Sequence, residues 1–193
     1  MPAEVTTELL MIRHAPAESQ GRVAGRRDVG ADCSATSVIA ALQARLGGVT
    51  ARVISPALRC RQTAAALWPG LALPEDARLW EQDFGAWEGR PWGDLPDLGA
   101  LTPEALAAHR PPQGESFDDL CQRVAPALGD LAGQGGRVAV VAHAGVIRAA
   151  LGLALGAAAR GLAFQVAPLS LTRIVAPPGG AWSIAEVNGG GVA

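Results

Sequence analysis

The sequence predicts an α/β fold, a three-layer α/β/α sandwich whose sheet is mostly parallel with one antiparallel strand. Short apolar segments alternate with segments of helical period along most of the chain, as in parallel strands joined by helices. Residues 163–176 contain strand-like segments without a helix between them, which favours an antiparallel strand there. The length of 193 residues favours one domain over residues 1–193, with an irregular excursion at about 71–116.

The first part of the chain supplies two strands and two helices. A buried strand is expected from about Glu8 to Arg13, because a run of four apolar residues ends there. After a long loop, apolar spacing predicts a helix from Ser34 to Leu46. A short strand follows at Arg52–Ile54. The next helix is expected to begin at Ser55-Pro56, with the serine as N-cap and the proline in the first turn, and to end near Leu67.

In the excursion, prolines interrupt every pattern except a short strand at 77–80 and a short helix at 103–108. Apolar periodicity beyond it predicts two more helices, at 116–131 and 145–155, flanking a central strand at 137–142. The remaining expected strands lie at about 163–166, 169–176 and 182–187, and the glycine-rich end, 189–191, is expected to be frayed.

Composition excludes several classes of function. The chain is 49% apolar and 18% charged, so it can bury a core. Its net charge of -2 predicts no nucleic-acid partner and no affinity for anionic membranes. The longest apolar segment, 138–164, is interrupted by charged residues, so no membrane helix is expected. All 16 basic residues are arginines, which excludes lysine chemistry.

The cysteines point to a reducing location. Cys33, Cys60 and Cys121 have no CxxC spacing, which argues against a disulfide framework and a zinc site. The N-terminus lacks a basic segment followed by an apolar one, so no signal peptide is expected. We therefore expect a cytoplasmic protein without a metal site.

Two of the three histidines directly follow buried-strand patterns. His14 ends the first strand and His143 ends the central one. Ligands of open parallel sheets bind at the carboxyl ends of the strands, so both side chains are expected at one rim. Either histidine alone could be structural, but two at equivalent strand ends favour a site. We interpret His14 as a nucleophile and Arg13, beside it, as part of an anion clamp.

Two further segments supply an anion site and an acid. Arg59 lies in the first turns of a predicted helix, where the helix dipole disfavours a cation unless an anion binds there. Glu81, Asp83 and Glu88 lie among aromatic residues, and one of them could stay protonated and act as a general acid. Spacing does not choose among the three. The tryptophans nearby are expected to pack the excursion onto the sheet rather than line a pocket.

Together these residues predict phosphoryl transfer. Arginines stabilise the charge of the transferring group, and a neutral imidazole attacks phosphorus to give a phosphohistidine. A carboxylic acid protonates the leaving alcohol, and water then releases phosphate. This chemistry needs neither a metal nor an organic cofactor.

The sequence resembles the histidine phosphatase superfamily, the phosphoglycerate mutase-like family, over nearly the whole chain. Five blocks in family order carry the resemblance. They are Arg13-His14-Ala15; Ser55-x-x-x-Arg59-x-x-x-Thr63-Ala64; Leu79-x-Glu81 with Phe84-Gly85-x-Trp87-Glu88-Gly89; Gly114-Glu115-Ser116 with Arg123-Val124; and Val140 to Arg148. The resemblance implies the phosphoglycerate mutase-like fold.

By position, the resemblance also implies roles. His14 is the phosphorylated nucleophile and Glu81 the proton donor. The groups that surround the phosphoryl group are Arg13, Arg59, His143 and the backbone N–H of Ala144.

The resemblance is weaker around the rest of the substrate. Arg26 lies in a loop similar to one that helps to form the family's pocket. Gln20 stands where many members have Asn and could donate to phosphate. Ala15 replaces the signature glycine, and Ala17 replaces a common threonine, so phosphate binding could differ.

Mutases of the family carry a larger insert, so the compact chain favours hydrolysis of a small phosphorylated metabolite. Short members of the family act on α-ribazole phosphate, sugar phosphates or phosphoproteins. The loop at residues 21–28 and the segment Gly114-Glu115-Ser116 resemble the α-ribazole phosphatase-like branch, so α-ribazole phosphate and sugar phosphates are candidate substrates, but the sequence does not choose between them. The alternatives are a mutase-type phosphotransferase and a phospho-ligand-binding protein without turnover. The oligomeric state stays open, with a homodimer as one option.

Overall fold

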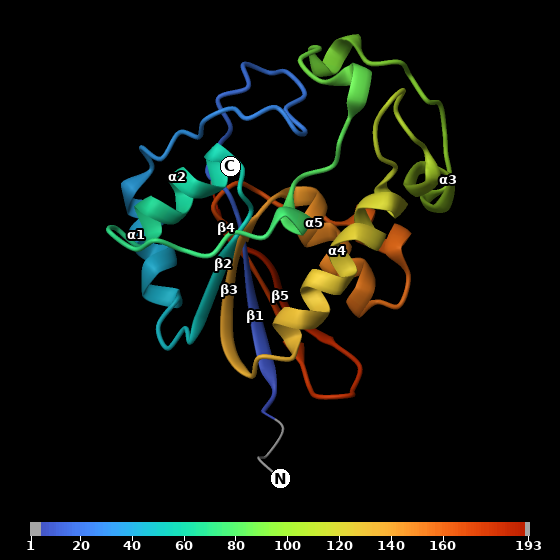
Figure 1. Ribbon diagram of the computed structural model, residues 1–193. Helices are drawn as coiled ribbons and strands as arrows, with labels where there is room; N and C mark the ends of the chain where they lie inside the picture. The colour runs from blue at the N-terminus through green and yellow to red at the C-terminus, as the bar shows by residue number, and fades with distance from the viewer. Residues whose placement is uncertain (1–4, 192–193) are drawn as a thin grey trace.

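The computed structural model describes residues 5–191. Residues 1–4, on which part of the signal-peptide expectation rests, lie outside that range. A five-stranded sheet of order β2-β3-β1-β4-β5 forms the centre of the described chain (Figure 1). Its strands are β1 (Thr7–Arg13), β2 (Ala51–Ile54), β3 (Gly136–Ala142), β4 (Ser170–Ala176) and β5 (Ser183–Gly190).

The strand directions match the predicted sheet. β3 pairs in parallel with both β1 and β2. β4 pairs antiparallel with β1, and β5 pairs antiparallel with β4, so β5 runs in the same direction as β1. β4 is therefore the one strand of this sheet that opposes the others, which confirms the mostly parallel α/β class.

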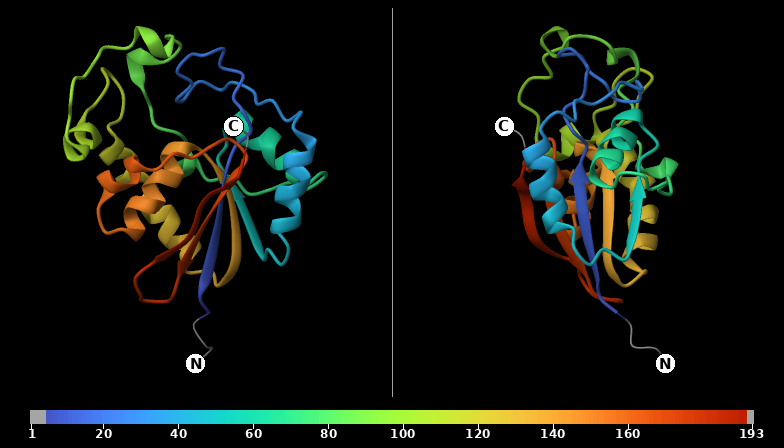
Figure 2. Two further views of the ribbon diagram at one scale, coloured as in Figure 1. Left: turned by 180° about the vertical axis from the view of Figure 1, so that it is seen from behind. Right: turned by 90° about the vertical axis from the view of Figure 1, so that its left-hand side faces the viewer.

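Helices cover both faces of the sheet. Alternate residues of β1 point to opposite sides, so Leu10 and Ile12 enter one core while Leu9 and Met11 enter the other. Figures 1 and 2 show the two helical layers on either side of the strands. The first layer contains α1 (Thr36–Arg45) and α2 (Leu58–Leu67), and the second contains α4 (Phe117–Ala132) and α5 (Ala144–Ala154).

The excursion carries the predicted helix, α3 (Pro103–Ala108), but the predicted strand at 77–80 is wrong. Residues Ala77–Leu79 form a 3-10 helix because the Asp76 side chain accepts from the Arg78 backbone N–H at 2.8 Å and caps a tight turn. Two further 3-10 turns follow, at Gly85–Trp87 and Trp92–Asp94.

Two expectations near the C-terminus are also wrong. No strand forms at 163–166, where a 3-10 helix (Ala158–Ala163) ends, because arginine side chains take the carbonyls of Phe164 and Val166. The glycine-rich end was expected to be frayed, but Gly189 and Gly190 belong to β5 and pair with β4. Among residues 5–191, no helix is both long and apolar enough to span a membrane.

The topology gathers the long connections at one end of the sheet. The loop after β1 and the excursion both lie beyond the carboxyl ends of β1 and β3, at the top of Figure 1. Backbone hydrogen bonds tie the two together, from Val23 to Arg90 at 2.9 Å and from Gly89 to Val23 at 2.9 Å. These segments enclose the space beyond the end of β1, where Arg13 and His14 lie.

Candidate active site

A cavity of about 300 Å³ opens at the carboxyl ends of the parallel strands. Five of the predicted site residues line it: Arg13, His14, Arg59, Glu81 and Ala144. The other lining residues are Ala17, Ser19, Arg22, Ala24, Gly25, Gln82, Phe84, Trp92, Phe117, Gly145, Arg148 and Leu162. Four arginines and one carboxylate make the wall strongly positive, although the chain as a whole is slightly acidic.

His14 is fixed in one tautomer at the end of β1. Its Nδ1 lies 2.6 Å from the Ala15 carbonyl, which can only accept, so Nδ1 carries the proton and Nε2 keeps a lone pair. The ring is only 3% exposed. Burial, together with the positive charges of Arg59 and Arg13, lowers the pKa of His14 to about 3. His14 is therefore neutral at physiological pH.

Ala15, which replaces the signature glycine, fits without strain. Its φ is not positive, and its side chain is fully buried in the core between the sheet and the α1–α2 layer. The backbone N–H of Ala15 donates to the Thr63 hydroxyl at 2.8 Å, and that hydroxyl donates to the Arg59 carbonyl at 2.7 Å. Thr63 thus links the residue after His14 to α2.

Arg13 reaches into the cavity from the residue before His14. One Nη donates to the Val166 carbonyl, and Nε is buried with no partner among the described residues. Burial lowers the pKa of Arg13, and Glu81 partly offsets that effect. A buried guanidinium with an unpaired N–H is suited to an incoming anion.

Arg59 and His143 form one hydrogen-bonded unit. Arg59 is 1% exposed, and it donates to the Gly25 carbonyl at 2.7 Å and to the Arg27 carbonyl at 3.0 Å. Its Nε donates to Nδ1 of His143 at 3.2 Å. His143 is fully buried beneath the cavity and is not part of its lining. Burial and the charge of Arg59 hold the pKa of His143 well below its ordinary value.

Ser55 supports His143 rather than capping a helix, so its prediction as an N-cap is wrong. Its hydroxyl lies 2.8 Å from Nε2 of His143, and α2 begins only at Leu58. The side chain of Asp28, from the loop after β1, accepts the Leu58 N–H at 2.6 Å in place of a local cap. Local sequence could not reveal a cap supplied from thirty residues away.

Glu81 lines the same cavity as His14. Its carboxylate accepts from the Gln82 N–H at 3.0 Å and from the Gly145 N–H, in the first turn of α5, at 3.3 Å. Gly145 leaves room for this contact, because a Cβ there would lie 2.2 Å from Oε1 of Glu81 and 2.8 Å from Cδ2 of Leu120 and would displace these side chains. Asp83 and Glu88 do not line the cavity, so geometry favours Glu81 as the acid.

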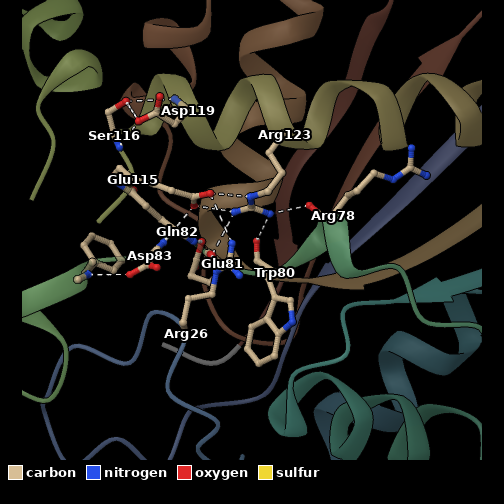
Figure 3. Close-up of polar contacts among 12 residues, drawn as sticks. Arg26, Arg78, Trp80, Glu81, Gln82, Asp83, Glu115, Ser116, Asp119 and Arg123 are labelled. Atoms are coloured by element: carbon tan, nitrogen blue, oxygen red, sulfur yellow. Dashed lines mark hydrogen bonds and ion pairs between the residues drawn. The ribbon is translucent and has the colours of Figure 1, made fainter. Parts of the chain in front are cut away.

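A polar network holds the backbone that carries Glu81 (Figure 3). Arg123, from α4, forms two 2.8 Å hydrogen bonds with the Glu115 carboxylate and donates to the carbonyls of Trp80 at 3.1 Å and Glu81 at 3.3 Å. Burial alone would raise the pKa of Glu115, but the hydrogen bonds from Arg123 outweigh it and keep that pKa below its usual value. Arg123 and Glu115, from the fourth sequence block, thus hold the backbone of Trp80 and Glu81 in place.

Two predicted substrate-binding residues lie outside the cavity lining. Gln20 is exposed in the loop after β1. Arg26 turns toward the network of Figure 3, where it donates to the Glu81 carbonyl at 3.1 Å and covers Trp80. Trp80 in turn stacks on His143, with ring planes 7° apart.

Some residues of the cavity wall were not predicted from the sequence. Ser19 and Arg22 line the cavity from the loop after β1, and Arg148 does so from α5. Trp92 lines it too, contrary to the expectation that the tryptophans only pack the excursion. Within residues 5–191, no group of three or more His, Cys, Asp or Glu side chains could hold a metal ion.

Several known proteins are similar to this chain in sequence or in fold. A bifunctional protein of Mycobacterium tuberculosis is 35% identical over an alignment 198 positions long, gaps included, which covers 94% of this chain and 54% of that protein. The chain thus spans about half the length of the curated relatives it matches.

Solved structures share the fold. A mycobacterial glucosyl-3-phosphoglycerate phosphatase superposes with a TM-score of 0.80 at 25% identity, covering 95% of this chain and 99% of that one. An Escherichia coli protein provisionally described as an alpha-ribazole-5'-P phosphatase has a TM-score of 0.79 at 24% identity, covering 97% of this chain and 98% of that one. The family model for the histidine phosphatase superfamily (branch 1) matches residues 9–189. The chain belongs to the histidine phosphatase superfamily.

Proposed function

We propose that this chain hydrolyses phosphomonoesters through a phosphohistidine at His14, without a metal ion. One observation carries the proposal: the neutral His14 ring, protonated on Nδ1, presents Nε2 in a cavity walled by four arginines. An imidazole with a free lone pair can attack phosphorus, and the guanidinium groups can stabilise the charge that develops on the phosphoryl oxygens.

In the first step, the Nε2 lone pair of His14 forms a bond to phosphorus as the bond to the leaving oxygen breaks. Arg13 and Arg59 bind the phosphoryl oxygens, with the backbone N–H of Ala144 at the start of α5. Glu81, as the acid, gives its proton to the leaving oxygen, and the alcohol departs.

In the second step, water attacks the phosphohistidine and the nitrogen–phosphorus bond breaks. Glu81 takes a proton from that water, so phosphate is released and both residues return to their starting states. In this scheme His143 is a positioning residue, because its Nδ1 holds Arg59 and its ring lies behind the cavity wall.

The substrate we propose is a small phosphorylated metabolite. The mycobacterial structure is described as acting on glucosyl-3-phosphoglycerate, a phosphomonoester of this size class, which supports the proposal. α-Ribazole phosphate and sugar phosphates are further candidates. The three free cysteines, Cys33, Cys60 and Cys121, support a reducing cytoplasmic location.

The test is hydrolysis of p-nitrophenyl phosphate by the purified protein in excess EDTA. The wild-type protein should hydrolyse p-nitrophenyl phosphate, and His14→Ala should lower the rate of hydrolysis by about 10³-fold or more. If the wild type is inactive over pH 5–8, the proposal fails. If His14→Ala retains the wild-type rate, the nucleophile is another group.

A further inference from the structure

We propose that Glu88 is a positioning residue for the proposed reaction, and that its carboxylate fixes the peptide unit on which the Arg59 guanidinium is held. This role rests on the proposed phosphatase activity and adds a residue to its phosphate clamp. Glu88 does not line the cavity, so it acts through the backbone rather than by contact with the substrate.

Oε1 of Glu88 joins the two long connections that enclose the cavity at the top of Figure 1. It accepts from the backbone N–H of Arg26, in the loop after β1, at 2.7 Å, and from that of Phe84, in the excursion, at 3.1 Å. Neither N–H has a backbone acceptor within residues 5–191. Half-buried backbone donors need an acceptor, so the carboxylate supplies what secondary structure supplies elsewhere.

The Arg26 N–H belongs to the same peptide unit as the Gly25 carbonyl. That unit is planar and trans, so its N–H and its C=O point in opposite directions. Glu88 binds the N–H end at 2.7 Å, and Arg59 donates to the C=O end at 2.7 Å. Because the unit is rigid, a hydrogen bond at one end fixes the direction of the other. An anion at the N–H end also polarises the unit and strengthens its carbonyl as an acceptor.

Arg59 depends on this carbonyl for its orientation. Its two Nη atoms donate to the carbonyls of Gly25 and Arg27, one each, and its Nε donates to His143. A guanidinium has five N–H donors, so one N–H on each Nη has no partner within the described residues. These two groups suit two oxygens of one phosphoryl group. If the peptide unit rotates, the guanidinium loses one of its three contacts and the free N–H groups lose their direction.

Gly25 leaves room for the carboxylate. Its φ is +50°, in the left-handed region that favours glycine, and a Cβ there would lie 2.1 Å from Oε1 of Glu88. Gly25 also lines the cavity, so the peptide unit between Glu88 and Arg59 forms part of the cavity wall. Glu88 therefore holds this wall from outside the lining.

Calorimetric binding of inorganic phosphate tests the role without requiring turnover. Glu88→Ala should raise the Kd for phosphate by about 10- to 100-fold, the range of a lost or misplaced charge-assisted hydrogen bond. Glu88→Gln should raise it by less than about fivefold, because the amide oxygen can still accept from both N–H groups but carries no charge.

The matched control is Asp76→Ala. It also removes a carboxylate that accepts a backbone N–H in the excursion, that of Arg78 at 2.8 Å, but Asp76 lies outside the cavity lining. This variant should unfold at lower urea concentration and keep the Kd for phosphate within about twofold of the wild type. If Glu88→Ala and Asp76→Ala bind phosphate equally well, Glu88 has no positioning role.

A double-mutant cycle shows whether Glu88 acts through Arg59. Arg59→Lys keeps the charge but loses the planar fork that the Gly25 carbonyl orients. Adding Glu88→Ala to Arg59→Lys should therefore change the Kd for phosphate and kcat/KM for p-nitrophenyl phosphate by less than about twofold. Additive losses would overturn the proposal. Should the alanine variant not fold, Glu88→Asp, which withdraws the carboxylate by one methylene, takes its place in the cycle with the same expectations.

The choice of ester separates the clamp from the acid. Losses in Glu88→Ala on p-nitrophenyl phosphate and on an alkyl phosphate should agree within about threefold, because the phosphoryl group of both esters meets the same clamp. A much larger loss on the alkyl phosphate would mean that Glu88 acts on the acid through Phe84, and it would also overturn the proposal.

Failure of this role is distinguishable from failure of the proposed function. Phosphate binding with the expected cycle, but without hydrolysis of any ester, removes the proposed function and keeps Glu88 as a positioning residue for bound phosphate. Hydrolysis that requires His14, with additive losses in the cycle, removes the role of Glu88 alone. If the wild type neither binds phosphate nor hydrolyses p-nitrophenyl phosphate, Arg59 is not a phosphate clamp and both proposals are wrong.

Discussion

Nε of Arg59 donates a hydrogen bond to Nδ1 of His143 at 3.2 Å. The contact requires an unprotonated Nδ1, so the neutral ring carries its proton on Nε2, where the Ser55 hydroxyl lies at 2.8 Å. Both ring nitrogens are therefore engaged inside a fully buried side chain. His143 thus links Ser55, which directly follows β2, to the Arg59 guanidinium at the cavity wall.

The first prediction concerns Ser55. Ser55→Ala leaves the buried Nε2 proton of His143 with only a weak acceptor, Sγ of Cys60 at 3.6 Å, so it should lower the free energy of unfolding by about 1–3 kcal/mol and slow hydrolysis. The matched control is Ser170→Ala, because the Ser170 hydroxyl is buried with no partner among residues 5–191. Urea unfolding should show Ser170→Ala to be neutral or stabilising; equal losses in the two variants would contradict this account of Ser55.

The second prediction concerns pH. The pKa of His14 lies at about 3 in the folded protein and near 6.5 in the unfolded chain, so the unfolded state binds the extra proton between these values. Stability should therefore fall as pH decreases from about 6.5 toward 3, by up to about 1.4 kcal/mol per pH unit from this residue. His14→Asn should make the dependence measured by urea unfolding less steep without abolishing it, because the buried His143 contributes in the same direction. An unchanged slope would mean that His14 is not buried as the neutral form.

The third prediction uses two helical glycines. Gly145→Ala places a Cβ 2.2 Å from Oε1 of Glu81, so the carboxylate must move, and hydrolysis of alkyl phosphates should fall by about 10²-fold. p-Nitrophenyl phosphate should lose less, because its leaving group needs no proton. Gly129→Ala, in α4 with no atom within 4 Å of the new Cβ, should keep full activity and gain up to about 1 kcal/mol. If Gly145→Ala and Gly129→Ala hydrolyse alkyl phosphates at the same rate, Glu81 is not the acid.

The fourth prediction concerns the network behind Glu81. Arg123→Gln removes both 2.8 Å hydrogen bonds to the Glu115 carboxylate, which keeps only the longer ones from Arg26 at 3.4 Å and the Asp83 N–H at 3.2 Å, and it removes the donor to the Trp80 carbonyl. The variant should lose about 1–3 kcal/mol of stability together with activity on alkyl phosphates. Arg110→Gln is the comparison, because the exposed pair of Arg110 with Asp119 is worth about 0.5 kcal/mol or less. If thermal melts and rates cannot distinguish the two variants, the network does not position the acid.

Features encoded by neighbouring residues could be predicted from the sequence. The apolar period gave β1, β3 and the helices, including the start of α4 near residue 116. His14 and His143 could be placed at one rim because they follow parallel strands, whose carboxyl ends meet at one edge of the sheet.

The remaining features depend on contacts between distant residues. Asp28 caps α2 from the loop after β1, which frees Ser55 for His143. Arg13 reaches the Val166 carbonyl across 153 positions, and this contact excludes the strand expected there. The loop after β1 and the excursion pair irregularly, so no periodic pattern could indicate that Arg22 and Trp92 would line the same cavity.

The covalent intermediate is the central claim, and rapid-quench labelling tests it most directly. The protein would be mixed with a 32P-labelled phosphomonoester, quenched in base within milliseconds and digested. We predict an acid-labile, base-stable phosphoryl group on the peptide that contains His14, and none in His14→Ala. Label on another residue, or steady hydrolysis without label on His14, would contradict the account.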